Sequence, residues 1–114
     1  MSRDYDLYLQ DIVEAADRIV SYVEGVTRHE FEADQMRIDA VIRNLGIIGE
    51  AVKKIPDSIR ERYPSVAWHN IAGLRNRVVH VYFNVDMDII WDVVQSKLPP
   101  LRTQIQQLIK EKSE

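Results

Sequence analysis

The sequence contains no cysteine, only four glycines and four prolines, and no long apolar run. The absence of cysteine excludes a disulfide framework and a thiolate metal site. No apolar stretch approaches the roughly 20 residues that cross a bilayer. The acidic, amphipathic start MSRDYDLYLQDIVEAADR is unlike a signal peptide. We therefore expect a soluble cytoplasmic protein, and its 114 residues predict one domain spanning 1–114.

The net charge is also small, −3, but it is spread unevenly. From Arg43 to Tyr82 there are seven Lys/Arg and three Asp/Glu, a net of +4, so the remainder of the chain carries −7. An acidic protein is a poor candidate for a broad nucleic-acid-binding face, whereas a basic middle favours a local phosphate site. A chance unevenness in a solvated surface is the alternative at this stage.

Apolar residues recur with a helical period, and no strand-like alternation with turn signals occurs. The period predicts a first helix over about 4–27 and a second over about 34–55, closed by Pro56. Gly46 and Gly49 leave one side of the second helix thin, which permits close helix approach although each glycine costs about 1 kcal/mol of propensity. The predicted apolar stripes are Tyr5, Leu9, Ile12, Ala16, Ile19 and Val23 in the first helix, and Ile38, Val41, Leu45, Ile48, Val52 and Ile55 in the second.

The second half of the chain continues the helical pattern. DSIRERYPSV predicts a short helical connection, and a third helix is expected over about 67–80. Asp86 or Asp88 can cap a fourth helix that reaches Leu98, and Pro99-Pro100 predicts a break or kink before a last helical segment. Four to five amphipathic helices with short connections indicate an all-α, up-down helical bundle.

Four aromatic residues have no obvious place in the core of a single bundle: Trp68, Tyr82, Phe83 and Trp91. A homodimer that buries part of this surface is therefore favoured. The alternative is that all four side chains fit inside one chain.

The stretch LRNRVVHVYF, residues 74–83, places polar groups on an otherwise apolar helix. On a helical wheel Arg75 falls within the apolar arc, which is costly for a charge without a partner. It can pair with Glu50 of the second helix, or the arc can face a second subunit with Arg75 at a phosphate-binding cleft. His80 lies one turn beyond Asn76. A lone histidine near a helix end more often caps the helix or makes a core hydrogen bond than transfers protons.

Within this stretch, RNRVVH is an R-x4-H element that Tyr82 extends to R-x4-H-x-Y. The element resembles the signature of the HEPN domains (higher eukaryote and prokaryote nucleotide-binding), specifically the HepT-like ribonuclease toxin branch. The segments YLQDIVEAADRIVSYVEG, AVIRNLGIIGEAVKKI, YPSVAWHNIAGLRNRVVHVYFNVD and IIWDVVQSKLPPL resemble that branch in its usual order. One departure is Val81, where many relatives have glycine.

The resemblance implies a dimeric HEPN-like bundle in which Arg75 and His80 of both chains line a cleft that cleaves RNA without a metal. His80 would be the general acid or base and Arg75 would stabilise charge on phosphorus. Asn76 would orient His80 or the phosphate, and Arg77 is a weaker candidate for a contact with RNA. The resemblance also implies a small nucleotidyltransferase antitoxin that transfers AMP to Tyr82.

Two alternatives belong to other classes of function. One is a non-catalytic subunit that uses the same cleft to hold a nucleotide or a nucleotidyltransferase, and the other is a structural dimer in which Arg75 pairs with Glu50. No cofactor is expected. The three histidines lack metal-ligand spacing, and GIIGEA lies within a helical pattern and does not follow a strand, so it is not a dinucleotide loop.

Overall fold

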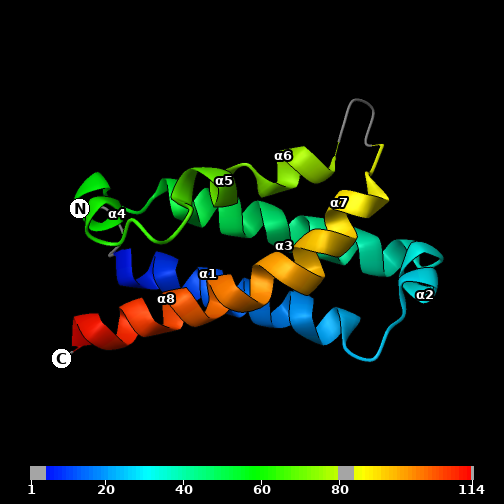
Figure 1. Cartoon of the computed structure of the whole chain (residues 1–114), viewed down its shortest axis with the longest axis horizontal. Helices are drawn as coiled ribbons and strands as arrows, with labels where there is room; N and C mark the ends of the chain where they lie inside the picture. The colour runs from blue at the N-terminus through cyan, green and yellow to red at the C-terminus, as the bar shows by residue number, and fades with distance from the viewer. Residues whose placement is uncertain (1–4, 80–83, 114) are drawn as a thin grey trace.

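The protein is an all-α bundle of four helical rods in an up-down arrangement, as the sequence predicts (Figure 1). The computed structural model describes residues 5–79 and 84–113, with the backbone alone for residue 113. Between these limits no strand occurs. The elements are α1 (Tyr5–Val23), α2 (Arg28–Glu32), α3 (Gln35–Lys53), α4 (Asp57–Arg62), α5 (Trp68–Ala72), α6 (Leu74–Val78), α7 (Met87–Asp92), the π-helical turn η2 (Val93–Lys97) and α8 (Leu98–Ser113).

The centre of the bundle is the contact between α1 and α3, which lie side by side (Figure 1). All six residues of the predicted α3 stripe are buried, and so are five of the six in α1, with Tyr5 partly buried against them. The opposite faces of both helices carry the polar residues, so burial of the two stripes drives their association. The two long helices are thus confirmed, and Asp34 caps the second, its carboxylate accepting from the Arg37 amide at 3.1 Å.

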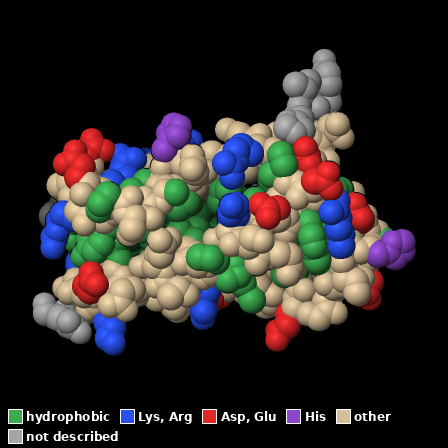
Figure 2. All heavy atoms as spheres, in the orientation of Figure 1, with side chains coloured by type: hydrophobic (Ala, Val, Ile, Leu, Met, Phe, Trp, Pro, Cys, Tyr) green, Lys and Arg blue, Asp and Glu red, His purple; other side chains and the backbone are tan. Residues whose placement is uncertain are grey.

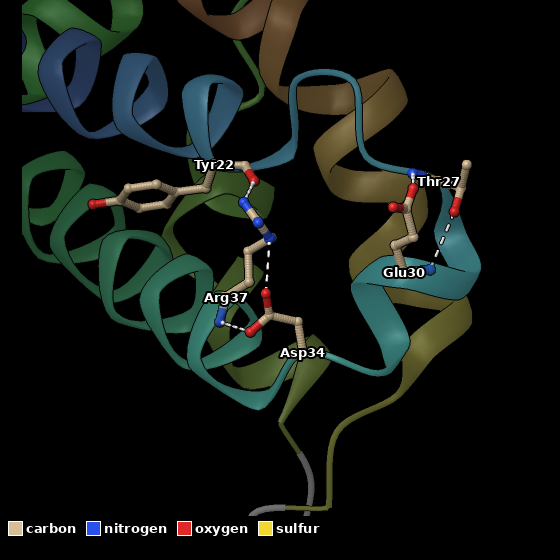
Figure 3. A network of polar contacts seen from close by, with 5 residues as sticks. All are labelled: Tyr22, Thr27, Glu30, Asp34 and Arg37. Carbon is tan, nitrogen blue, oxygen red and sulfur yellow. Dashed lines mark hydrogen bonds and ion pairs between the residues drawn. The ribbon is translucent and has the colours of Figure 1, made fainter.

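The short helix α2 was not predicted from the sequence. It turns the chain from α1 to α3 after Gly25, whose φ is 72°. Its signal was present: Thr27 and Glu30 form a capping box (Figure 3). The Glu30 amide donates to Thr27 Oγ1 at 3.1 Å, and the Thr27 amide donates to Glu30 Oε1 at 3.0 Å. The Thr27 backbone bond lowers the pKa of Glu30, so the box is complete at neutral pH and weakens as the pH falls through that lowered value.

The Arg37 side chain bonds to both sides of this connection, at the end of α1 and at the start of α3 (Figure 3). Its Nη1 donates to the Tyr22 carbonyl oxygen at 2.6 Å, at the end of α1, and its Nε donates to Asp34 Oδ2 at 3.1 Å. One guanidinium therefore satisfies a carbonyl at the C-terminus of α1 and the cap of α3, which fixes how the two helices meet.

The two glycines of α3 have different surroundings. A Cβ on Gly49 would lie 2.9 Å from the carbonyl oxygen of Ala72, whereas a Cβ on Gly46 would meet nothing within 4 Å. The predicted close approach is thus confirmed at Gly49, where α3 packs on α5. Gly46 faces open space.

This difference predicts opposite effects of alanine at the two positions. Gly49→Ala should lower the free energy of unfolding by about 1–3 kcal/mol, because backbone must move to admit the methyl group. Gly46→Ala should raise it by up to about 1 kcal/mol through helix propensity alone. Urea unfolding of both variants checks the pair, and shifts of equal sign and size would contradict the packing described.

The prediction of one continuous third helix over 67–80 is wrong. The segment is two short helices, α5 and α6, divided at Gly73, whose amide donates back to the Asn70 carbonyl at 3.2 Å. Glycine's low helix propensity allows the division. Helix α6 ends at Val78, because Val79 is extended and forms a bridge with Val85.

The predicted break at Pro99-Pro100 does not occur, because a π-helical turn changes the hydrogen-bond spacing just before the two prolines. The chain stays helical from α7 through η2 into α8, and the Leu98 amide donates to the Val93 carbonyl, five residues back. The wider π turn moves carbonyls that the proline rings would otherwise strike. Asp86 caps α7 as expected, its carboxylate accepting from the Ile89 amide at 3.1 Å.

Two of the four aromatic residues that suggested a dimer find places within one chain. Trp68 is buried and its Nε1 donates to the Tyr63 carbonyl at 3.1 Å. Trp91 packs on Phe31 with ring centroids 5.5 Å apart. Tyr82 and Phe83 lie outside the described residues. The homodimer therefore stays a prediction, and these two tryptophans do not require it.

Candidate functional site

Arg75 lies in α6 between two buried residues, Leu74 and Val78, and is itself half-buried. The apolar setting predicted for it is therefore confirmed. Its Nη1 donates to Asn76 Oδ1 at 3.3 Å. A neutral amide oxygen does not offset the charge of a guanidinium, so Arg75 keeps most of its capacity to bind an anion.

Glu50 is not the partner of Arg75 in the part of the chain that the structure describes. Its carboxylate instead pairs with Lys53 Nζ at 3.4 Å, one turn along α3. The purely structural interpretation of Arg75, which rested on an Arg75–Glu50 ion pair, therefore loses its main support.

Two hollows open beside Arg75, and both are bordered by α3. The larger, of about 630 Å³, is an open depression bordered by α1, α3 and the α5–α6 pair. The smaller, of about 510 Å³, lies between α3 and the Val79–Val85 bridge. Arg43, Gly46 and Arg75 line both hollows. The larger is lined by Tyr8, Asp11, Arg43, Gly46, Ile47, Gly49, Glu50, Ala51, Lys53, Lys54, Ala72, Arg75 and Asn76.

The larger hollow is basic on balance. Arg43, Lys53, Lys54 and Arg75 line it against two carboxylates, those of Asp11 and Glu50, in a protein whose overall charge is negative. Elsewhere the charges mix: on the face drawn in Figure 2, Lys/Arg and Asp/Glu side chains are interspersed over the surface. A concave site with local positive potential attracts phosphate even when the whole chain is acidic.

The structure brings some predicted site residues together and separates another. Asn76 is exposed and lines the larger hollow beside Arg75. Arg77 is exposed but lines a different hollow, of about 300 Å³, together with Lys97 of η2. Arg77 thus lines neither of the two hollows beside Arg75.

His80, Val81 and Tyr82 lie outside the described residues, so their predicted roles stay predictions. The residues that border them are described. Val79 and Val85 form a bridge, the Asp86 amide donates to the Val78 carbonyl at 2.8 Å, and both valines line the smaller hollow with Arg75.

Within the described ranges, no group of three or more His, Cys, Asp or Glu is arranged to hold a metal ion. Over the same ranges, none of the helices is both long and apolar enough to cross a membrane.

Arg43 and Gly46 were not singled out as site residues from the sequence. Their spacing of three on α3 places them on one face, and the run from Arg43 to Tyr82 was already recognised as basic. The missing information was which helix faces them, since α6 begins 28 residues after Gly46.

Comparison with known proteins gives one consistent result. The family described as Ribonuclease HepT-like matches residues 12–108. A Methanocaldococcus jannaschii protein named as a candidate RNase is 38% identical over 109 residues, which cover 96% of this chain and 90% of that protein. A Thermococcus cleftensis protein named probable ribonuclease HepT is 36% identical over 110 residues, covering 96% of this chain and 100% of its own. No solved structure matches the chain.

Proposed function

The chain belongs to the HepT-like ribonuclease family, and from that premise we propose that it is an endoribonuclease that cuts RNA without a metal ion. The proposal rests chiefly on the setting of Arg75. It is a half-buried arginine of the R-x4-H element that lines a basic cleft and, among the described residues, has no carboxylate partner. Arginine's planar fork matches the oxygens of a phosphodiester.

The chemistry needs only groups that the chain and the RNA supply. The ribose 2′-hydroxyl loses its proton, its oxygen attacks the adjacent phosphorus, and the O5′ bond breaks as that oxygen takes a proton. His80 is the general base or acid for these transfers, with an unperturbed pKa of about 6.5 that suits neutral pH. Arg75 stabilises the negative charge that grows on the phosphoryl oxygens. Asn76 orients Arg75, to which it is already hydrogen-bonded.

In the proposed assembly two copies of the chain place Arg75 and His80 at one shared cleft. The α3–α6 side supports this arrangement, because Ile42, Val79 and Val85 line the smaller hollow next to Arg75. Ile42 and Val85 are apolar and only partly buried, so a second copy that covers them would remove apolar surface from water.

We further propose that the protein is the toxin of a toxin–antitoxin pair. A small nucleotidyltransferase antitoxin would silence it by transferring AMP to Tyr82. The phenol oxygen attacks the α-phosphorus of ATP, pyrophosphate leaves, and the phenol proton is released. The added phosphate carries negative charge two residues from His80 and repels the phosphates of RNA.

Cleavage in a chelator tests the enzymatic proposal. Purified protein should cut single-stranded RNA in EDTA and leave 2′,3′-cyclic phosphate ends, because the 2′-oxygen is the nucleophile and no metal takes part. Gel electrophoresis with end-group analysis by mass spectrometry measures both. RNA that stays intact would favour the non-catalytic binding subunit, and cleavage that stops in EDTA would overturn the metal-independent mechanism.

A further inference from the structure

A second arginine accompanies Arg75 at both hollows. Arg43 comes from α3 and Arg75 from α6, and Gly46, the third residue common to the two hollows, lies one turn beyond Arg43 on α3. The two arginines therefore border both hollows, which adjoin at Gly46 and are together called the groove.

Arg43 differs from most arginines of the described chain in its lack of a partner. Arg28, Arg37, Arg60 and Arg102 each pair with an aspartate, and Arg18 donates to Asn44 at 3.2 Å. Within the described residues the Arg43 guanidinium has no ion pair or hydrogen bond, which is also true of Arg62 and Arg77, and Arg75 has only the amide of Asn76. Of these arginines only Arg43 and Arg75 line the two hollows. The chain has 18 acidic residues for 15 basic ones, so these two cations stay unpaired although carboxylates are plentiful. Such an arrangement suits an anion from outside the chain.

Gly46 keeps the groove between the two arginines open. A Cβ there would stand in free space, with no heavy atom within 4 Å, so any larger side chain would project into the groove. Glycine inside a helix lowers its stability by about 1 kcal/mol relative to alanine, and close helix packing accounts for Gly49 but not for Gly46. A bare helix surface lets a bulky ligand come close to the backbone.

The larger hollow continues along α3 from Arg43 to Lys53. Eleven residues at about 1.5 Å each give a length of about 16 Å. This shape suits an extended strand that passes through better than a compact anion. An RNA duplex is read across its wide, shallow minor groove, whereas a basic groove that follows the backbone is typical of single-strand binding.

We propose that Arg43 binds a backbone phosphate of single-stranded RNA adjacent to the phosphate held by Arg75, with the strand lying over Gly46. The inference rests on the proposed ribonuclease function, and it adds the class of substrate and a second phosphate contact. Arg43 is a substrate-binding residue here, and it takes no part in proton transfer.

Binding of an RNA that cannot be cut separates this inference from catalysis. A 2′-O-methyl oligoribonucleotide has no free nucleophile, so its dissociation constant can be measured by fluorescence anisotropy whether or not the protein is an enzyme. Arg43→Ala should raise the dissociation constant about tenfold and should lower the slope of its salt dependence by about 0.7, the value for one phosphate contact to a single strand. Arg43→Lys should keep the salt slope.

Two further variants control for charge and for space. Lys110→Ala on α8 also removes one positive charge but lies away from both hollows, and it should bind like wild type. Gly46→Leu should fold at least as stably as wild type, because leucine favours a helix and its Cβ would have no heavy atom within 4 Å. It should nevertheless bind the oligonucleotide at least tenfold more weakly, because the atoms beyond its Cβ would occupy the groove.

Wild-type affinity in Arg43→Ala or in folded Gly46→Leu would overturn the inference. If instead Gly46→Leu only dissociates a dimer while Arg43→Ala binds RNA normally, the groove is an interface between copies and the inference also fails. Loss of binding in Arg43→Ala combined with no cleavage by wild type in EDTA would support the RNA groove and reject the nuclease.

Discussion

His80→Ala is expected to lower the rate of RNA cleavage by about 10²–10⁴, the usual contribution of a positioned general acid or base. The proton of the attacking 2′-hydroxyl, or the one delivered to the leaving O5′, would have to be exchanged with water. The variant should keep its thermal unfolding temperature and its affinity for the 2′-O-methyl oligonucleotide, because binding depends on the arginines. Single-turnover cleavage in EDTA measures the effect.

His69→Ala is the matched control, because His69 is an exposed histidine on α5 that lines neither hollow beside Arg75. It should cleave RNA like wild type. Arg75→Ala should lose activity to a similar degree and still fold, since no ion pair of the described chain is lost with it. Unchanged cleavage by His80→Ala would reject its assignment as a catalytic residue, and unfolding of Arg75→Ala would revive the structural interpretation of that arginine.

The second large effect concerns Tyr82. Co-expression with a nucleotidyltransferase encoded next to the protein should add one or more AMP units to the chain and should abolish RNA cleavage by the purified product. The reason is steric and electrostatic, since the group is bulky, anionic and two residues from His80. Intact-mass spectrometry measures the gain, and RNA cleavage in EDTA measures its consequence.

Tyr82→Phe should show no gain of mass and should stay active after co-expression. Tyr63→Phe is the matched control, because Tyr63 contributes its backbone carbonyl to Trp68 and its hydroxyl is not needed for that bond. It should be modified and silenced like wild type. A gain of mass that persists in Tyr82→Phe would place the modification on another residue and remove the proposed switch.

The sequence was sufficient for features that depend on local spacing. The apolar stripes of α1 and α3 repeat every three to four residues, and a helix must bury such a stripe, so both helices and their buried faces were predictable. The cap at Asp86 has the same local origin. The capping box of Thr27 and Glu30 is an equally local pattern, and it was sufficient to predict the start of α2.

Features that depend on competition between local and distant contacts were not predictable. Gly73 fits inside a continuous helical pattern, yet the chain divides there into α5 and α6 while α5 packs closely on Gly49. Pro99-Pro100 read as a break, yet packing of α7, η2 and α8 on the bundle keeps that rod helical through a π turn. In both places a weak local preference yields to burial of side chains from other helices.

The sequence by itself determined the helical class, the core stripes, the family and the R-x4-H-x-Y element, because each is a pattern of residue types along one chain. Only the tertiary structure decided that Glu50 pairs with Lys53, that Arg75 has no carboxylate partner in the described chain, and that Arg43 joins Arg75 at one groove. Side-chain partners are chosen by the distances that helix packing sets, and α3 meets α6 through contacts that no local spacing encodes. Gly46 shows the difference most clearly: the sequence suggested a close helix contact, and the fold leaves open space.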